Sequence, residues 1–233
     1  MSKLNNDPMQ IANLRISRRS FLSIAAASFL TGCADSPVLV NAYEAVEFLV
    51  VGLEDKEIDR STINGIPYAS ISAKIGRGPR SILVLGKQQG HDLHWFSADD
   101  AVLVTRNGRI IRTAGFPENI RNTTFSDEDP VARQFHRSNF SKRSLRSIDM
   151  DPNQLYGVPV ISNYEVVGER EIMISGIKIK TRLVREYNTS FSINWTFSNY
   201  YWADIYDGFI WKSRQYIARG FDPLDIEVLK PPA

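Results

Sequence analysis

One predicted β-hairpin constrains the fold of this chain more than any other local feature. In AVLVTRNGRIIRTA, residues 101–114, the dipeptide Asn107-Gly108 separates two runs rich in β-branched residues. Asn-Gly favours positive φ at both positions, and this forms the two-residue turn that suits the twist of antiparallel strands. The turn fixes the register and predicts two opposed pairs, Val104 with Ile111 and Val102 with Thr113.

Alternation with a period of two recurs along much of the chain and predicts further half-buried strands. In SINWTFSNYYW the residues Ile193, Trp195, Phe197 and Tyr201 fall on one side, and Tyr200 and Trp202 fall on the other. Pro231 and Pro232 would end the last strand, because proline cannot donate to a ladder. Besides the hairpin, the predicted strands are 68–75, 81–85, 93–97, a stretch from Val160, 177–183, 192–202, 208–218 and 224–230.

Two segments break this pattern. Residues 116–153 are polar and charged in blocks, so we expect an irregular connector with short helical structure between two β-rich halves. Residues 41–51 have an apolar face at helical spacing, with Asn41 as a cap and Glu44 three residues later, and they predict a helix. The expected fold class is mainly β, an antiparallel sandwich or barrel-like domain of nine to eleven strands with one or two helices.

Composition is typical of a globular protein, and the charge argues against nucleic-acid binding. Hydrophobic residues make up 43% of the chain and charged residues 23%, which is ordinary for a globular protein. The net charge of +2 comes largely from residues 1–32, because the remainder holds 24 basic and 25 acidic residues. A nearly neutral body does not favour nucleic-acid binding, which needs a basic excess.

The amino-terminal segment predicts export and lipidation. A polar, basic stretch precedes the apolar run Phe21–Leu30, and Leu30-Thr31-Gly32-Cys33 resembles a bacterial lipobox. Ten apolar residues are too few to span a bilayer. The single cysteine therefore predicts a lipid attachment site, carrying acyl chains such as palmitate, at the mature amino terminus. The predicted division is a signal peptide at 1–32, a tether at 33–40 and one β-rich domain at 41–233.

The same leader predicts the export route. Arg18 and Arg19, followed by Phe21 and Leu22, look like a twin-arginine signal, although serine occupies position 23 where lysine is frequent. Ala34 follows the lipidated cysteine where aspartate would favour retention in the inner membrane. We therefore expect a lipid anchor on the periplasmic face of the outer membrane, with the inner membrane as the alternative.

Aromatic residues provide the candidate ligand-binding site. Trp95, Trp202 and Trp211 offer flat apolar faces for sugar rings, and Arg214 offers hydrogen-bond donors. Aromatic residues also fill β-sheet cores, which is the competing explanation. The basic residues between 133 and 146 suit an acidic polysaccharide or the anionic membrane, and a solvated loop is the competing explanation.

Catalytic and metal-binding signals are weak. Glycoside hydrolysis needs two carboxylates about 5 to 10 Å apart, and the candidates are Asp99, Asp100, Asp204 and Asp207. His91 and His94 fall in a predicted turn and strand, where their spacing splits the two faces, so no metal site is predicted. The chain carries no phosphate loop or nucleophile elbow, and we expect no cofactor and no catalytic residue.

Three stretches of the chain carry a family resemblance: WFSADDAVLVTRNGRIIRTAGF (95–116), YWADIYDGFIWKSRQYI (201–217) and PLDIEVLKPP (223–232). The resemblance is to the YjbF-type lipoproteins, the family of the group 4 capsule lipoprotein of exopolysaccharide operons. It implies a β fold and a role in producing or exporting capsule or exopolysaccharide, and it transfers no catalytic residue. The expected function is thus a non-enzymatic lipoprotein that contacts export-operon proteins or the polymer. The main alternative is a periplasmic, hydrolase-like enzyme that modifies the glycan, and a third possibility is a structural envelope lipoprotein unrelated to sugars.

Overall fold

The computed structural model describes residues 58–132 and 134–232. Within them, one short helix, α2 (Arg60–Gly65), precedes a single twelve-stranded sheet. The strands are β1 (Ser70–Ile75), β2 (Arg80–Gln89), β3 (Asp92–Phe96), β4 (Val102–Arg106), β5 (Arg109–Ala114), β6 (Asn119–Phe125), β7 (Arg143–Asp151), β8 (Leu155–Ile174), β9 (Ile177–Ser190), β10 (Trp195–Asp204), β11 (Ile210–Gln215) and β12 (Leu224–Lys230).

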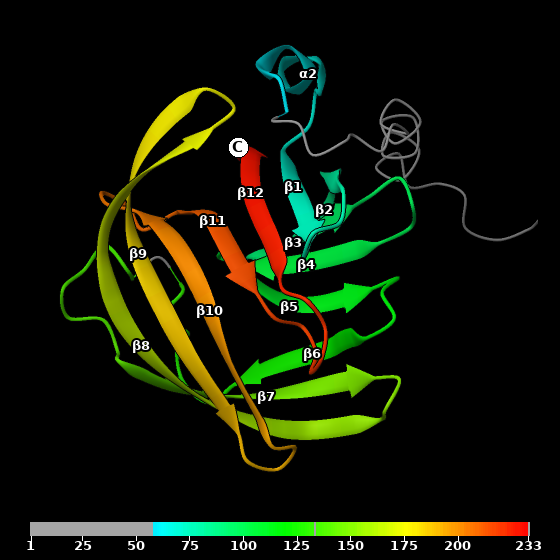
Figure 1. Cartoon of the computed structure of the whole chain (residues 1–233), viewed down its shortest axis with the longest axis vertical. Helices are drawn as coiled ribbons and strands as arrows, with labels where there is room; N and C mark the ends of the chain where they lie inside the picture. Colours follow the sequence, from blue (N-terminus) through cyan, green and yellow to red (C-terminus); the bar gives the residue numbers. More distant parts are fainter. Residues whose placement is uncertain (1–57, 133, 233) are drawn as a thin grey trace, which may run out of the picture. The chain divides into compact units, whose positions relative to one another are not determined.

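The sheet curls into a nearly closed barrel (Figure 1). Its strand order is β5-β4-β3-β2-β1-β12-β11-β10-β9-β8-β7-β6, and the backbone pairings are antiparallel. Hydrogen bonds from side chains join the two edge strands, β5 and β6. The amide of Ile120 donates to Thr113 Oγ1 at 2.9 Å, and Thr123 Oγ1 donates to the carbonyl of Ile111 at 3.0 Å. These bonds satisfy edge groups that would otherwise be open to another chain.

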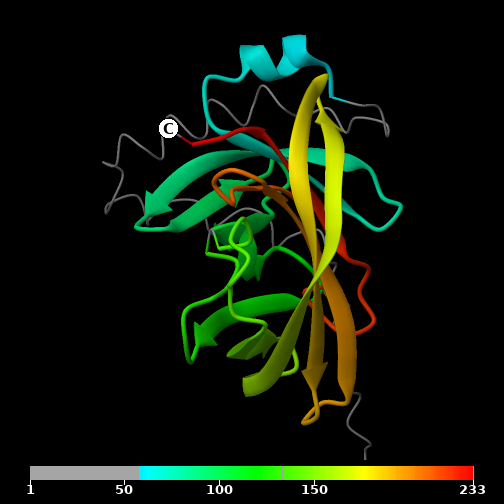
Figure 2. The same ribbon diagram turned by 90° about the vertical axis from the view of Figure 1, so that its left-hand side faces the viewer.

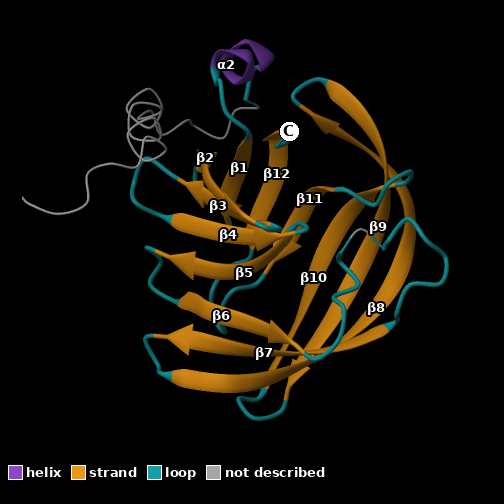
Figure 3. Cartoon of the chain, turned by 180° about the vertical axis from the view of Figure 1, so that it is seen from behind, coloured by secondary structure: helices purple, strands orange, loops and turns teal. Residues whose placement is uncertain are grey.

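Alternating strand direction gives the barrel two distinct ends. Because neighbouring strands are antiparallel, the even-numbered strands all finish at one end, which we call the mouth. The turns β2–β3, β4–β5, β8–β9 and β10–β11 therefore lie at the mouth, as does the connection from β6 to β7. The view from behind shows β2 to β7 along one side and β8 to β11 along the other (Figure 3). The long β8–β9 hairpin extends past the neighbouring strands (Figure 2).

Three apolar clusters form the core. The largest fills the barrel interior and includes Leu83, Trp95 and Leu103. The second gathers Phe135 and Phe140 of the β6–β7 connection against Tyr164 and Tyr201 of the sheet. The third lies on the outer face, where Ile63 of α2 packs with Ile82 and Val84 of β2. No helix in the described residues combines the length and apolar character needed to span a membrane.

The predicted fold class is confirmed, and the hairpin at 101–114 is present as β4 and β5. Its predicted register is wrong beyond the turn. A bulge between Val104 and Thr105 pairs Val104 with Arg112 and Val102 with Ala114. The bulge leaves Ile110 and Ile111 both buried, which a regular strand would not do.

Two other predictions need correction. The expected connector at 116–153 contains β6 and β7, and most of its irregular residues lie between these strands. The described residues therefore form twelve strands in one sheet, where nine to eleven in two halves were expected. The predicted helix at 41–51 lies outside the described residues, and α2 was not predicted.

The β4–β5 turn provides a test of the barrel packing. Gly108 has a φ of +92°, and a Cβ there would lie 2.5 Å from Cβ of Ile210 on β11. We expect Gly108→Ala to lower the free energy of unfolding by about 1–3 kcal/mol more than a strain-only control. Gly176→Ala is that control, because Gly176 has a φ of +79° with no atom within 4 Å of the added Cβ. Equal unfolding midpoints in urea would contradict the packing described.

Candidate functional site

A buried carboxylate organises the polar part of the barrel interior. Glu186 on β9 has no solvent-exposed surface and accepts hydrogen bonds from five side chains. Its Oε1 accepts from Arg109 Nη2 at 2.8 Å, Arg146 Nη1 at 3.0 Å and Tyr164 Oη at 2.9 Å. Its Oε2 accepts from Arg109 Nη1 at 3.1 Å, and from Asn199 Nδ2 at 2.8 Å and Tyr201 Oη at 3.1 Å.

Asp129 completes the charge balance of this cluster. It lies between β6 and β7, and its Oδ2 accepts from Arg109 Nε at 2.6 Å. Two guanidinium groups thus face two carboxylates. We call Arg109, Asp129, Arg146, Tyr164, Glu186, Asn199 and Tyr201 the Glu186 network. Its members come from β5, β7, β8, β9, β10 and one connection, so it ties together segments far apart in the sequence.

Electrostatics keep Glu186 ionised. Burial alone would raise its pKa, but the charges of Arg109 and Arg146, together with the donated hydrogen bonds, hold the pKa well below the usual 4.5. Burial raises the pKa of Tyr164 and Tyr201, and the Glu186 charge adds to this effect. A fully buried, strongly ionised carboxylate cannot deliver protons to a ligand, so this network is structural.

A cavity of about 250 Å³ opens at the mouth of the barrel. Strands β1, β3, β4, β11 and β12 contribute to its walls, and the β2–β3 and β4–β5 turns form part of its rim. We call this space the mouth cavity and define it by Gln88, His91, Leu93, Trp95, Thr105 and Trp211. It combines aromatic walls with polar rim groups, which is typical of small-ligand sites.

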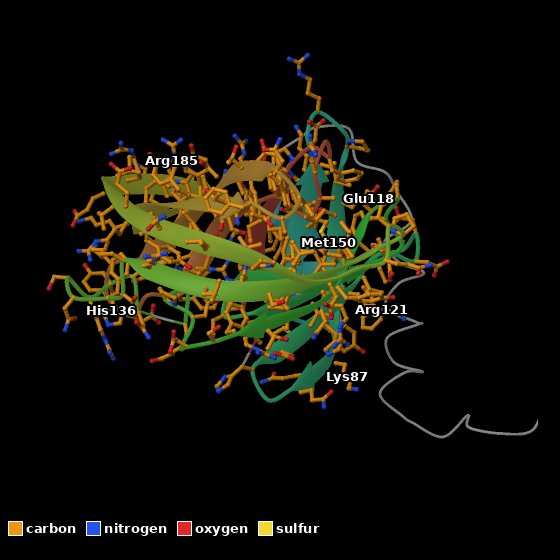
Figure 4. All side chains as sticks on the ribbon, turned by 90° about the horizontal axis from the view of Figure 1, so that it is seen from below. Lys87, Glu118, Arg121, His136, Met150 and Arg185 are labelled. Carbon is orange, nitrogen blue, oxygen red and sulfur yellow. The ribbon has the colours of Figure 1, made fainter. Side chains whose placement is uncertain are left out.

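Aromatic and cationic side chains also alternate on the outer face of β9, β10 and β11. Cross-strand pairing puts Tyr200 opposite both Arg185 and Arg214, and Trp202 opposite Lys212. The Arg185 guanidinium carbon lies 4.0 Å from the Tyr187 ring centroid. Figure 4 shows Arg185 at the outer surface, whereas Met150 lies toward the centre. We call Arg185, Tyr187, Tyr200, Trp202, Lys212 and Arg214 the outer strip.

The four predicted glycan-binding residues divide between these two places. Trp202 and Arg214 belong to the outer strip, and the Arg214 guanidinium pairs with Asp225 at 2.7 Å. Trp95 and Trp211 line the mouth cavity. Trp95 is only 2% exposed and donates Nε1 to Thr105 Oγ1 at 2.8 Å. The structure therefore does not unite the four residues in one surface. Cys33, Arg18, Arg19, Phe21 and Leu22 lie outside the described residues.

The candidate catalytic acids form two pairs at opposite ends of the barrel, and the pair Asp204 and Asp207 accepts hydrogen bonds within a turn. Asp99 and Asp100 follow β3, whereas Asp204 and Asp207 flank the start of the β10–β11 turn at the opposite end of the barrel. Asp204 accepts from the amide of Tyr206 at 2.8 Å and from Trp211 Nε1 at 3.1 Å. Asp207 accepts from the amide of Phe209 at 2.8 Å. These bonds shape the turn and hold the Trp211 ring.

The predicted histidine pair does not gather metal ligands. His91 lies at the cavity rim, whereas His94 lies on β3, where burial and then the nearby charges of Lys87 and Arg112 lower its pKa. The described residues contain no group of three histidine, cysteine or acidic side chains arranged to hold a metal.

Sequence reasoning missed the Glu186 network. Its best signal was strand alternation in β7, where Ser144, Arg146, Ile148 and Met150 all point to the buried face. An arginine in register with apolar inward residues indicates a buried charge that needs a carboxylate partner. The basic stretch at 133–146 therefore holds an internal arginine as well as exposed cations such as Arg143.

Removing the Glu186 charge should destabilise the barrel strongly. Glu186→Gln keeps the side-chain size but leaves buried Arg146 without a carboxylate partner and Arg109 with only Asp129. We expect a loss of about 3–5 kcal/mol in the free energy of unfolding at pH 7, measured by urea denaturation. Glu165→Gln is the control, because exposed Glu165 only accepts from Tyr187 Oη on the outer face, at 2.9 Å. A loss under 1 kcal/mol for Glu186→Gln would contradict the proposed role.

The free energy of unfolding should also depend on pH differently in the wild-type protein and in Glu186→Gln. Because the pKa of Glu186 lies below its ordinary 4.5, its carboxylate stabilises the fold above about pH 4.5, and this stabilisation fades as pH falls further. The wild-type chain should therefore lose stability steadily below pH 4.5, whereas Glu186→Gln should show a shallower decline. Parallel curves for the two proteins would count against the assignment.

Comparison with known proteins identifies the family. The uncharacterized lipoprotein GfcB of Escherichia coli K12 is 27% identical over 92% of this chain and 99% of its own length. The uncharacterized lipoprotein YjbF of the same strain is 22% identical over 77% of this chain and 83% of its own. The crystal structure of the hypothetical lipoprotein YmcC from E. coli K12 matches with a TM-score of 0.72 and 26% identity, covering 87% of this chain and all of that one.

The family model extends over nearly the whole barrel. The model described as group 4 capsule polysaccharide lipoprotein, GfcB and YjbF, matches residues 43–229. This span contains the outer strip, the Glu186 network and all but the last residues at the mouth cavity. The resemblance expected from the sequence is confirmed, and the chain belongs to the YjbF family of group 4 capsule polysaccharide lipoproteins.

Proposed function

We propose that this protein is a non-catalytic accessory lipoprotein that assists the production or export of capsule or exopolysaccharide. Acyl chains on Cys33 hold it at the periplasmic face of the outer membrane, after export through the twin-arginine route. The barrel then contacts the polymer, and export-operon proteins are its further partners. Membership of a capsule lipoprotein family supports this proposal.

The outer strip is the observation that carries the glycan contact. Sugar rings present apolar C–H faces and hydroxyl edges, so they suit flat aromatic rings beside hydrogen-bond donors. Tyr200 and Trp202 have ring centroids 6.5 Å apart on neighbouring outward positions. A polymer chain could lie along such a strip without entering a pocket, because the strip follows an open sheet face.

Of the three cations on the outer strip, Arg185 is the one best placed to contact a glycan. Lys212 Nζ lies 2.6 Å from Glu227, which also binds Arg80, and Arg214 is paired with Asp225. Arg185 forms no salt bridge with any described residue; it stacks on Tyr187 and lies 3.4 Å from Ser198 Oγ. Its guanidinium therefore keeps donors for hydroxyl or carboxylate groups of a glycan.

The arrangement of acids favours binding over hydrolysis. A glycosidase needs two carboxylates about 5–10 Å apart with room for a sugar between them. Asp99 and Asp100 lie at the opposite end of the barrel from Asp204 and Asp207. Asp204 and Asp207 share one turn, and each accepts a hydrogen bond from a backbone amide of that turn. Glu186 is buried and ionised, so it cannot act as a general acid. The alternative, a periplasmic glycan-modifying enzyme, would release new reducing ends from the purified polymer, whereas an accessory protein would release none.

Loss of the lipid anchor should change where the protein is found in the cell. We expect Cys33→Ala to move the protein from the membrane fraction to the soluble periplasmic fraction, since acyl chains provide stable attachment. Deleting the gene should lower surface polysaccharide, and the Cys33→Ala gene should restore it incompletely. Cell fractionation and a surface polysaccharide assay measure both effects. Persistent membrane attachment of the variant, or unchanged polysaccharide in the deletion strain, would refute the respective assignment.

The outer strip should account for binding of the intact polymer. We expect Trp202→Ala to weaken binding about tenfold, which corresponds to about 1.4 kcal/mol. Affinity electrophoresis in gels containing the purified exopolysaccharide measures this change. Tyr156→Ala is the matched control, because Tyr156 is an exposed aromatic residue near the start of β8, outside the strip. Equal retardation of both variants would show that the strip does not bind the polymer.

A further inference from the structure

The mouth cavity is a second place where the barrel can hold a ligand. Unlike the outer strip, it is enclosed by strands and turns on several sides. Below it the interior is filled by buried side chains of the main core, including Leu83, Leu103 and Ile217. The cavity is therefore blind, and a ligand can enter only from the mouth. A chain passing through the barrel has no exit at the other end.

The walls of the cavity have a fixed aromatic geometry. The Trp211 ring packs edge-on against Phe209, with centroids 4.8 Å apart and an interplanar angle of 71°. The bond from Trp211 Nε1 to Asp204 holds that ring in place. Trp95 is 2% exposed and donates Nε1 to Thr105, so it closes the inner end of the cavity and leaves half-buried Trp211 as the aromatic wall. Rigid aromatic walls bind a flat apolar face with little loss of side-chain entropy.

Polar groups at the rim define what this aromatic pocket accepts. Gln88, His91 and Asn107 line the opening and supply neutral donors and acceptors. The described lining contains no carboxylate, and its single ammonium group, on Lys212, is already paired with Glu227. An uncharged, hydroxyl-bearing ring suits these surroundings better than an acidic group or a long acyl chain. A volume of about 250 Å³ lies just below the range of roughly 300–1,000 Å³ that holds drug-sized ligands, so the cavity suits a small ligand such as a single sugar ring.

We propose that the mouth cavity binds the terminal, uncharged sugar of the polymer end-on, with Trp211 as the stacking wall. This inference rests on the proposed function and adds a second mode of contact to it. The outer strip binds the polymer along its length, whereas the mouth cavity recognises a chain end. A protein with both sites would hold a growing or emerging chain by its tip and its side.

Chain length distinguishes the two sites. The probes are oligosaccharides of two to four sugars, prepared by partial acid hydrolysis of the purified exopolysaccharide, and the intact polymer. The protein is the full lipoprotein in phospholipid nanodiscs, and calorimetry with tryptophan fluorescence measures binding. We expect the oligosaccharides to bind, and Trp211→Ala to weaken their binding at least tenfold. Trp202→Ala should leave it unchanged, because a short chain in the cavity does not reach the strip.

Further variants guard against a folding artefact. Trp211→Phe should retain most of the oligosaccharide affinity, because it keeps a ring at the wall but loses the bond to Asp204. Leu93→Trp should block the cavity from a different strand, and urea denaturation verifies that each variant is folded. Oligosaccharide binding that survives both Trp211→Ala and Leu93→Trp would overturn the cavity assignment.

The remaining outcomes separate this inference from the proposed function. If the intact polymer binds in a Trp202-dependent manner but no oligosaccharide binds, the end-on site is wrong and the accessory role stands. If neither probe binds, the glycan contact itself is wrong, and the cavity inference falls with it. If oligosaccharides bind and are cleaved, the enzymatic alternative replaces both.

Discussion

The fold depends on one buried carboxylate balanced by two guanidinium groups. Glu186 receives six hydrogen bonds from five side chains on β5, β7, β8 and β10, and Asp129 neutralises the remaining charge of Arg109. Such a cluster is costly unless every member is paired, because burial removes each charge from water. Complete pairing makes the position of each strand conditional on the others. The cluster therefore ties the inner faces of β5, β7, β8, β9 and β10 together.

The Glu186 network pairs only inward side chains, whereas the cations of the outer strip are paired separately, Lys212 with Glu227 and Arg214 with Asp225. Along β9, β10 and β11, inward residues such as Glu186, Tyr201 and Gln215 hold the interior together. The residues between them point outward and form the outer strip. The mouth cavity lies in another part of the interior, lined by β1, β3, β4, β11 and β12. One sheet thus combines the paired Glu186 network in its interior with a cavity at one end and an aromatic, cationic strip on its outer face.

Much of the fold followed from the sequence, and the errors share a physical cause. Alternation predicted β10 correctly because its inward residues Trp195, Phe197 and Tyr201 are aromatic. It failed at β7 because two inward residues are Ser144 and Arg146, which belong to the charged interior and resemble a solvated loop. The hairpin at Asn107-Gly108 was evident, but its bulge depends on the tertiary burial of both Ile110 and Ile111. The candidate aromatic residues were found, but their division between cavity and strip requires the sheet order.

The most direct test of the account is a footprint of the polymer on the protein. Hydroxyl-radical labelling with mass spectrometry should show protection of Tyr187 and Trp202 on the outer strip and of Trp211 at the mouth when purified exopolysaccharide is added. Phe191, exposed at the opposite end of the barrel, should remain fully reactive, and the polymer should keep its length. Unchanged labelling at the strip and mouth, or shortening of the polymer, would contradict a non-catalytic glycan-binding role.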